Sequence, residues 1–74
     1  MGIQVVMDRS GDSRHVFDAN DRSAIAEAET RFRQLTAKGY RAVAFGKEGG
    51  TGELIKDFDP TVARTVFIPA LVGG

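Results

Sequence analysis

One amphipathic helix in the middle of the sequence restricts the fold more than any other feature. Asn20, Asp21 and Ser23 have side chains that cap helices. The apolar residues that follow recur at spacings of three and four, which places them on one stripe: Ile25, Ala28, Phe32 and Leu35. Gly39 ends the pattern, with Lys38 near the negative end of the helix dipole. We therefore expect a helix over about residues 21–38, whose apolar stripe must be buried against another element.

The residues before this helix have the pattern of a β-hairpin. Gly2–Asp8 reads G-I-Q-V-V-M-D, so Ile3, Val5 and Met7 share one face of a strand. Residues 9–13 are turn formers, and Arg14–Asp18 is a second alternating run. The pattern predicts two paired strands, with the Ile3 and Val5 face directed into the core.

The residues after the helix return to strand patterns. Tyr40–Phe45 is a short apolar run between two glycines, and its length favours a strand. Residues 47–52 contain three glycines and predict a mobile loop, followed by a weaker strand or turn over residues 53–60. Arg64–Val72 has the highest β-propensity, and Pro69 marks where regular pairing on that side must stop.

These elements predict an α+β domain with one helix packed across a mixed sheet of four to five strands, which is the β-grasp arrangement. Its core should contain the larger apolar residues of each element. We expect the following to be largely buried: Ile3, Val5, Phe17, Ile25, Phe32, Leu35, Phe45 and Phe67.

Composition excludes several classes of function. The chain has 74 residues, enough for one domain but too few to house a catalytic cleft easily. It contains no cysteine and a single histidine, His15, so metal and thiol chemistry are not expected. Ten basic residues balance ten acidic ones without long charge runs, which argues against nucleic-acid binding. No apolar run is long enough to span a membrane, and we expect a cytoplasmic protein.

The chain resembles the ubiquitin family in length, in the order of its elements and in its final Gly73-Gly74. Ile3 and Val5 are similar to the core pair of the family's first strand. Residues 41–47 resemble its third strand and the turn after it, and residues 64–74 resemble its last strand and tail. The resemblance implies a β-grasp domain over residues 1–69 and a flexible tail over residues 70–74, and it is closest in character to bacterial ubiquitin-like proteins.

The family resemblance also implies a function for the tail. In this family an activating enzyme uses ATP to adenylate the terminal carboxylate, takes it as a thioester and passes it to an amine. Gly73 and Gly74 would form the thin, flexible end that enters the enzyme. The implied partners are this activating enzyme, a conjugating enzyme, a deconjugating protease and a target protein. The chain itself would be a monomer when free, would contribute no catalytic group and would need no cofactor.

The residues before the diglycine depart from ubiquitin, which has an arginine on either side of a leucine. Here Ala70 and Val72 flank Leu71. The departure favours a dedicated activating enzyme with an apolar entrance, so that Ala70, Leu71 and Val72 are the candidate recognition residues of the tail.

Further candidate residues lie outside the tail. Val43, Val66 and Ile68 are on strands where ubiquitin exposes an apolar recognition patch, although the alternative is that they belong to the core. Lys38, Lys47 and Lys56 are the only lysines and the candidate sites for self-linked chains, although solvated surface lysines are common. The glycine-rich segment at 47–52 lacks the spacing of a phosphate-binding loop, and His15 is assigned no role.

Three hypotheses follow. The first is a modifier joined through Gly74 to protein amines. The second is a sulfur carrier, in which the adenylated carboxylate becomes a thiocarboxylate. The third is a β-grasp interaction or assembly module that is not conjugated, whose diglycine is an ordinary chain end.

Overall fold

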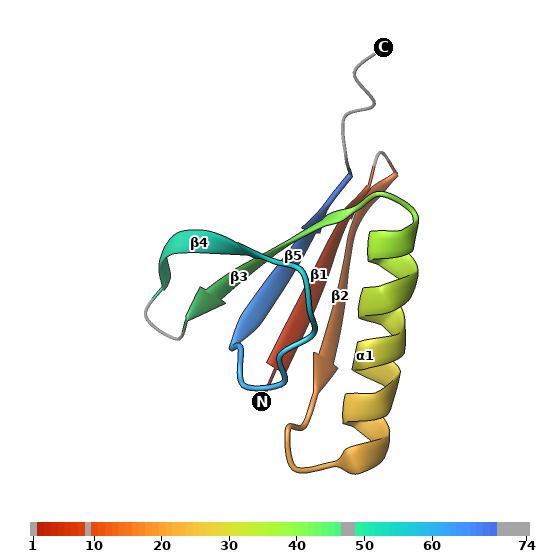
Figure 1. The fold of residues 1–74 in the computed structure, drawn as a ribbon, viewed down its shortest axis with the longest axis vertical. Helices are drawn as coiled ribbons and strands as arrows, with labels where there is room; N and C mark the ends of the chain where they lie inside the picture. The colour runs from red at the N-terminus through yellow and green to blue at the C-terminus, as the bar shows by residue number, and fades with distance from the viewer. Residues whose placement is uncertain (1, 9, 47–48, 70–74) are drawn as a thin grey trace.

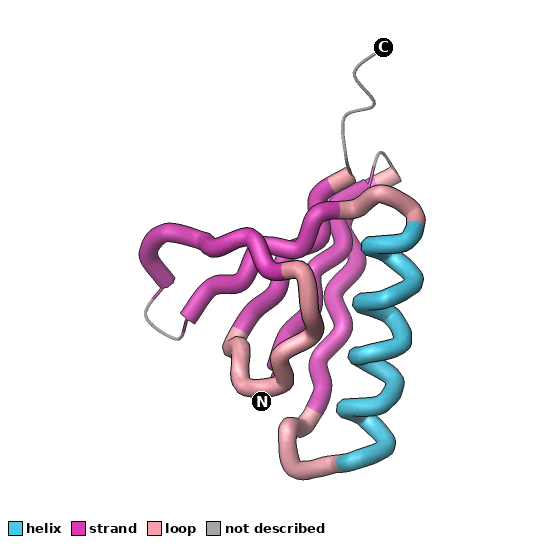
Figure 2. The backbone as a smooth tube through the Cα atoms, in the orientation of Figure 1, coloured by secondary structure: helices cyan, strands magenta, loops and turns pink. Residues whose placement is uncertain are grey.

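Five strands and one helix form the described part of the chain, residues 2–8, 10–46 and 49–69 of this computed structural model (Figure 1). In chain order they are β1 (Gly2–Asp8), β2 (Gly11–Phe17), α1 (Arg22–Ala37), β3 (Arg41–Gly46), β4 (Gly49–Ile55) and β5 (Arg64–Ile68). The strands form one sheet in the order β2-β1-β5-β3-β4. β1 and β5 are parallel and the other pairs are antiparallel. Helix α1 lies across one face (Figure 2), so the predicted α+β class is confirmed.

Helix α1 begins and ends where its capping residues predict. The side chain of Asp21 accepts hydrogen bonds from the backbone N–H groups of Ser23 at 3.0 Å and Ala24 at 3.3 Å. These bonds satisfy two of the N–H groups that a helix start leaves without partners. At the other end Lys38 is the C-cap, and Gly39 takes a positive φ of 99°, which glycine adopts without steric cost.

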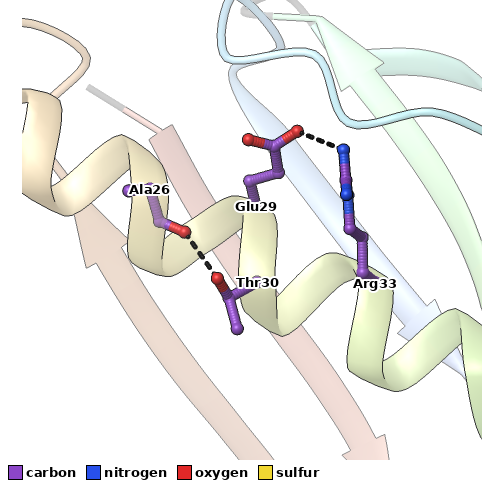
Figure 3. Close-up of polar contacts among 4 residues, drawn as sticks. All are labelled: Ala26, Glu29, Thr30 and Arg33. Atoms are coloured by element: carbon purple, nitrogen blue, oxygen red, sulfur yellow. Dashed lines mark hydrogen bonds and ion pairs between the residues drawn. The ribbon is translucent and has the colours of Figure 1, made fainter.

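The outer surface of α1 holds only local polar contacts (Figure 3). Arg33 Nη2 lies 3.0 Å from Glu29 Oε2, and the Thr30 hydroxyl donates to the Ala26 carbonyl at 2.9 Å. An exposed ion pair of this spacing contributes only about 0.3–0.5 kcal/mol. The helix therefore depends on its inward face for stability.

The core between α1 and the sheet is built around aromatic rings. Phe32 packs edge-on against Phe67 of β5, with ring centroids 5.6 Å apart, and against Phe58 at 6.0 Å. Phe58 comes from the connection after β4 and also contacts Phe17. The predicted burial of Phe17, Phe32 and Phe67 is confirmed. The other five predicted core residues are only half-buried: Ile3, Val5, Ile25, Leu35 and Phe45.

The predicted inward face of β1 is wrong. The structure directs Gln4 toward α1 and leaves Ile3 and Val5 on the opposite face. Gln4 is only 1% exposed, and its amide donates to the Ala28 carbonyl at 3.0 Å and accepts from Arg31 at 2.9 Å. A buried amide with both polar groups satisfied is tolerated in a core. Nothing in the alternation of the sequence shows that these two partners exist.

A glycine contributes to the same choice of face. Gly2 pairs with Phe17 across the β1–β2 hairpin, and the Phe17 ring occupies the space that a side chain would take. A Cβ atom at Gly2 would lie 2.3 Å from Phe17 Cζ. Because paired residues share a face, burying Phe17 places Gly2 and then Gln4 toward the helix.

The strand boundaries differ from expectation in two places. The hairpin is confirmed, but β2 begins at Gly11, whose φ of 128° suits glycine, rather than at Arg14. β4 begins at Gly49, so the prediction of a loop is wrong for residues 49–52. Pairing with β3 makes this glycine-rich segment a strand despite its low β-propensity. β5 ends at Ile68, directly before Pro69, as predicted.

Candidate functional site

The candidate residues of the tail lie outside the described residues. These are Ala70, Leu71, Val72, Gly73 and Gly74. The structure does place the segment that leads to them. β5 lies between β1 and β3 in the centre of the sheet and ends at Ile68. The chain therefore reaches Pro69 from the middle of the sheet rather than from an edge.

The face of the sheet that α1 does not cover brings the three candidate patch residues together. Val43 of β3 is paired with Val66 of β5, and Ile68 lies two residues further along β5, on the same face. Val66 is also paired with Val5 of β1, and Val43 with Leu54 of β4. Four apolar side chains, one from each of four strands, thus form a continuous row. Two of these side chains, Val5 and Leu54, were not among the patch residues that the sequence indicated.

We call this surface the open face. Its apolar members are Ile3, Val5, Met7, Val16, Val43, Phe45, Leu54, Val66 and Ile68, placed there by strand alternation and register. Four of them are the exposed large hydrophobic residues of the described chain: Met7 at 41%, Val16 at 57%, Leu54 at 65% and Ile68 at 43%. Contiguous exposed apolar surface of this kind marks interaction sites on small soluble proteins.

The charged residues of the open face are mainly arginines. Arg14 of β2 pairs with Val5, Arg41 of β3 with Ile68, and Arg64 of β5 with Phe45. Asp12, at the β2 edge, is the one acidic residue on this face in the described strands. The open face is therefore apolar along its centre and positively charged around it.

Phe45 has a defined position at one end of the open face. The Arg64 guanidinium carbon lies 5.0 Å from the centroid of its ring, a cation–π arrangement. A Cβ atom at Gly52 would lie 2.8 Å from Phe45 Cζ, so the ring occupies the space above the β4 backbone. Glycine at this position lets the ring cover the strand, and this contact explains why Phe45 is half-buried without lying in the core.

The candidate lysines are on separate elements. Lys38 is the C-cap of α1, and Lys56 follows β4. Both are exposed, as an acceptor amine must be, and exposed lysines are also ordinary surface residues. Lys47 lies outside the described residues.

His15 lies on the helix face of β2, paired with Gln4. Partial burial, and then the positive charge of Arg31, hold the pKa of His15 below its usual value of 6.5. Within residues 2–8, 10–46 and 49–69, no three metal-ligating side chains come together.

Comparisons with protein-family models, curated proteins and solved structures give no significant match. In the part of the chain that the structure describes, α1 is too short and too polar to cross a bilayer.

The sequence alone indicated three apolar members of the open face and did not indicate the other six. Ile3, Val5 and Phe45 were expected in the core because they are large, apolar and correctly spaced. The sequence did not indicate that Arg14, Arg41 and Arg64 share one face, because they are far apart along the chain. The available signal was the alternation of apolar residues along β1, β3 and β5. Whether these residues are exposed depends on which face of the sheet α1 covers.

Proposed function

We propose that this chain is a β-grasp protein modifier of the ubiquitin-like type, joined to target proteins through the carboxylate of Gly74. The observation that carries the proposal is the fold. Two strands, a helix and three strands succeed one another, with the helix across a mixed sheet and the last strand at its centre, leading to the Gly73-Gly74 end. This is the arrangement expected of a β-grasp domain with a C-terminal arm.

In the proposed reaction the chain supplies the carboxylate and no catalytic group. A partner enzyme transfers AMP from ATP to the Gly74 carboxylate and releases pyrophosphate. A cysteine thiolate of that enzyme then displaces AMP to form a thioester, and a target amine displaces the thiolate to form an amide. A conjugating enzyme and a deconjugating protease complete the proposed set of partners. The lack of cysteine in the sequence agrees with the role of a transferred group.

The open face gives the modifier a surface by which partner proteins could recognise it. Its apolar row Val5, Val66, Val43 and Leu54 crosses the sheet, and Ile68 lies one residue before Pro69. Recognition near Ile68 would therefore be next to the segment that carries the reactive end. Arginines beside this row favour partners whose binding surfaces are acidic.

The deciding experiment mixes the purified chain with ATP and its cognate activating enzyme. The wild type should form a thioester that a reductant removes, and Gly74→Ala should form it much more slowly with an unchanged melting temperature. Ser10→Ala, a change in an exposed turn, is the matched control and should form the thioester at the wild-type rate.

Two outcomes would overturn the proposal. If the wild type forms no thioester, or Gly74→Ala forms it as fast as the wild type, the diglycine is only a chain end. If mass spectrometry instead finds oxygen replaced by sulfur on Gly74, the chain is a sulfur carrier. A Gly-Gly remnant on peptides from other proteins would support the modifier.

A further inference from the structure

The outer edge of β4 is a second candidate surface, separate from the tail and from the open face. β4 is the last strand in the order β2-β1-β5-β3-β4, and no described strand pairs with its outer side. Figure 1 shows the β3–β4 hairpin projecting to the side opposite α1. An edge strand presents backbone N–H and C=O groups that another strand can bind. The edge at β2 carries Asp12, Arg14 and His15, whereas β4 carries one charged residue, Glu53.

Two hollows adjoin this strand. One, of about 360 Å³, lies between the end of α1 and the β3–β4 pair and is largely apolar, with Lys56 beside it. Its lining includes Tyr40, Ala42, Leu54 and Ile55. The other, of about 450 Å³, is more polar and includes Thr51, Glu53 and Thr61. Residues of β4 thus line part of both hollows.

The side chains of β4 alternate between the two faces of the sheet. Every second residue of β4 lies on the helix side of the sheet: Thr51, Glu53 and Ile55. Leu54 lies on the open face and is 65% exposed. A strand added outside β4 would place every second side chain beside Ile55, Glu53 and Thr51 in turn. The intervening side chains would contact Leu54 and lie opposite Lys56.

We propose that the outer edge of β4 binds an extended segment of a partner protein as an antiparallel sixth strand. Charge complementarity defines the segment: an acidic residue opposite Lys56, an apolar residue opposite Ile55, an apolar residue opposite Leu54 and a basic residue opposite Glu53. Glu53 makes no ion pair within the described residues. Backbone hydrogen bonds supply affinity, and the alternating side chains supply selectivity.

A second copy of this chain fits the edge less well. Two antiparallel copies related by a two-fold axis pair only residues that lie on the same face of the sheet. Glu53 can then face Glu53, Thr51 or Ile55, none of which is basic, because Glu53 is the one charged residue of β4. Self-pairing thus leaves Glu53 without an opposite charge, whereas a partner segment with a basic residue supplies one.

The test uses an acetylated, amidated peptide of sequence Glu-Leu-Val-Lys-Val-Thr and the full chain labelled with ¹⁵N. Binding should shift the amide resonances of Thr51–Ile55 most strongly and slow their hydrogen exchange. Two further peptides are N-methylated on alternate residues, in the two possible phases. Only one phase directs its methyl groups at β4, so one peptide should lose binding and the other should retain it.

A second experiment exchanges the charges of Glu53 and of the peptide lysine expected opposite it. Glu53→Lys should weaken binding of the peptide about fivefold or more, and a peptide with glutamate in place of its lysine should recover it. Glu27→Lys makes the same change of charge on the exposed surface of α1 and should alter neither affinity. The backbone at Glu53 is unchanged, so the melting temperature should stay near that of the wild type.

Several results would overturn the proposal. They are no binding of the unmodified peptide, equal binding of both methylated peptides, shifts confined to the open face, and a failure of the exchanged pair to recover affinity. Concentration-dependent dimerisation that Glu53→Lys abolishes would assign the edge to a second copy instead. Because none of these measurements uses the tail, they stand or fall separately from conjugation through Gly74.

Discussion

The two faces of the sheet are both rich in apolar residues, yet only one of them is a core. The helix face buries Phe32, Ala42 and Phe67 and includes two buried polar residues, Gln4 and Thr65. The open face has more apolar side chains, and four of its large ones are exposed. The difference shows that apolar character alone does not decide burial. In the described part of the chain one helix covers one face of the sheet, and the other face is left uncovered.

Phe32→Ala should give the largest difference between the faces. Phe32 is 2% exposed and packs against Phe58 and Phe67, so its truncation should cost about 3–5 kcal/mol of the free energy of unfolding. Such a loss is a large part of what a domain of this size holds, and the variant should be partly unfolded at room temperature. Urea denaturation followed by circular dichroism measures it.

The matched variant on the open face is Leu54→Ala. Its side chain is 65% exposed, so the same kind of truncation should change the free energy of unfolding by less than about 0.5 kcal/mol. Equal losses for Phe32→Ala and Leu54→Ala would mean that the open face is part of a core.

The two glycines that lie against aromatic rings sharpen the comparison. A Cβ atom at Gly2 meets the ring of Phe17, which is buried, and Gly2→Ala should cost about 1–3 kcal/mol. A Cβ atom at Gly52 meets Val43 and Phe45, whose side chains can move toward solvent on the open face. Gly52→Ala should therefore cost less than Gly2→Ala in the same denaturation experiment. The reverse order would contradict the assignment of the faces.

The buried amide of Gln4 gives a smaller and more specific effect. Arg31→Met removes the hydrogen bond to Gln4 Oε1 and leaves a buried acceptor without its partner, at a cost of about 1–2 kcal/mol. Replacing Gln4 by Met in the same protein removes that acceptor, so the double variant should recover much of the loss. A double variant that is less stable than Arg31→Met alone would show that Gln4 contributes mainly through Ala28.

The smallest expected effect is a dependence on pH at His15. Burial and Arg31 lower the pKa of His15 in the folded state, so folding favours its neutral form. The stability it contributes is complete above the unfolded pKa of 6.5 and is lost as pH falls below it toward the folded pKa. Thermal melts between pH 7.5 and pH 5 should show this decline, and His15→Gln should remove that part of it. An unchanged profile in His15→Gln would assign the decline to carboxylates.

The sequence predicted the local elements well because their causes are local. Asp21 and Gly39 determined the ends of α1, and Pro69 determined the end of β5. Alternation indicated β1, and a short apolar run between two glycines indicated β3. The first half of β4 was missed because its glycines have low β-propensity, and only the pairing with β3 makes them a strand. Of the candidate site, the sequence indicated Val43, Val66 and Ile68 but could not determine their face.

That face was decided by the tertiary structure alone. A shift of one residue in register reverses the two sides of a strand, and the more apolar side of β1, with Ile3 and Val5, is not the side that α1 covers. The choice depends on contacts between distant residues: Phe17 above Gly2, Gln4 against Ala28 and Arg31, and Phe67 beneath Phe32. The sequence by itself determined the order of the elements and most of their bounds. Only packing, which joins residues far apart in the chain, decided which apolar surface became the core and which stayed open.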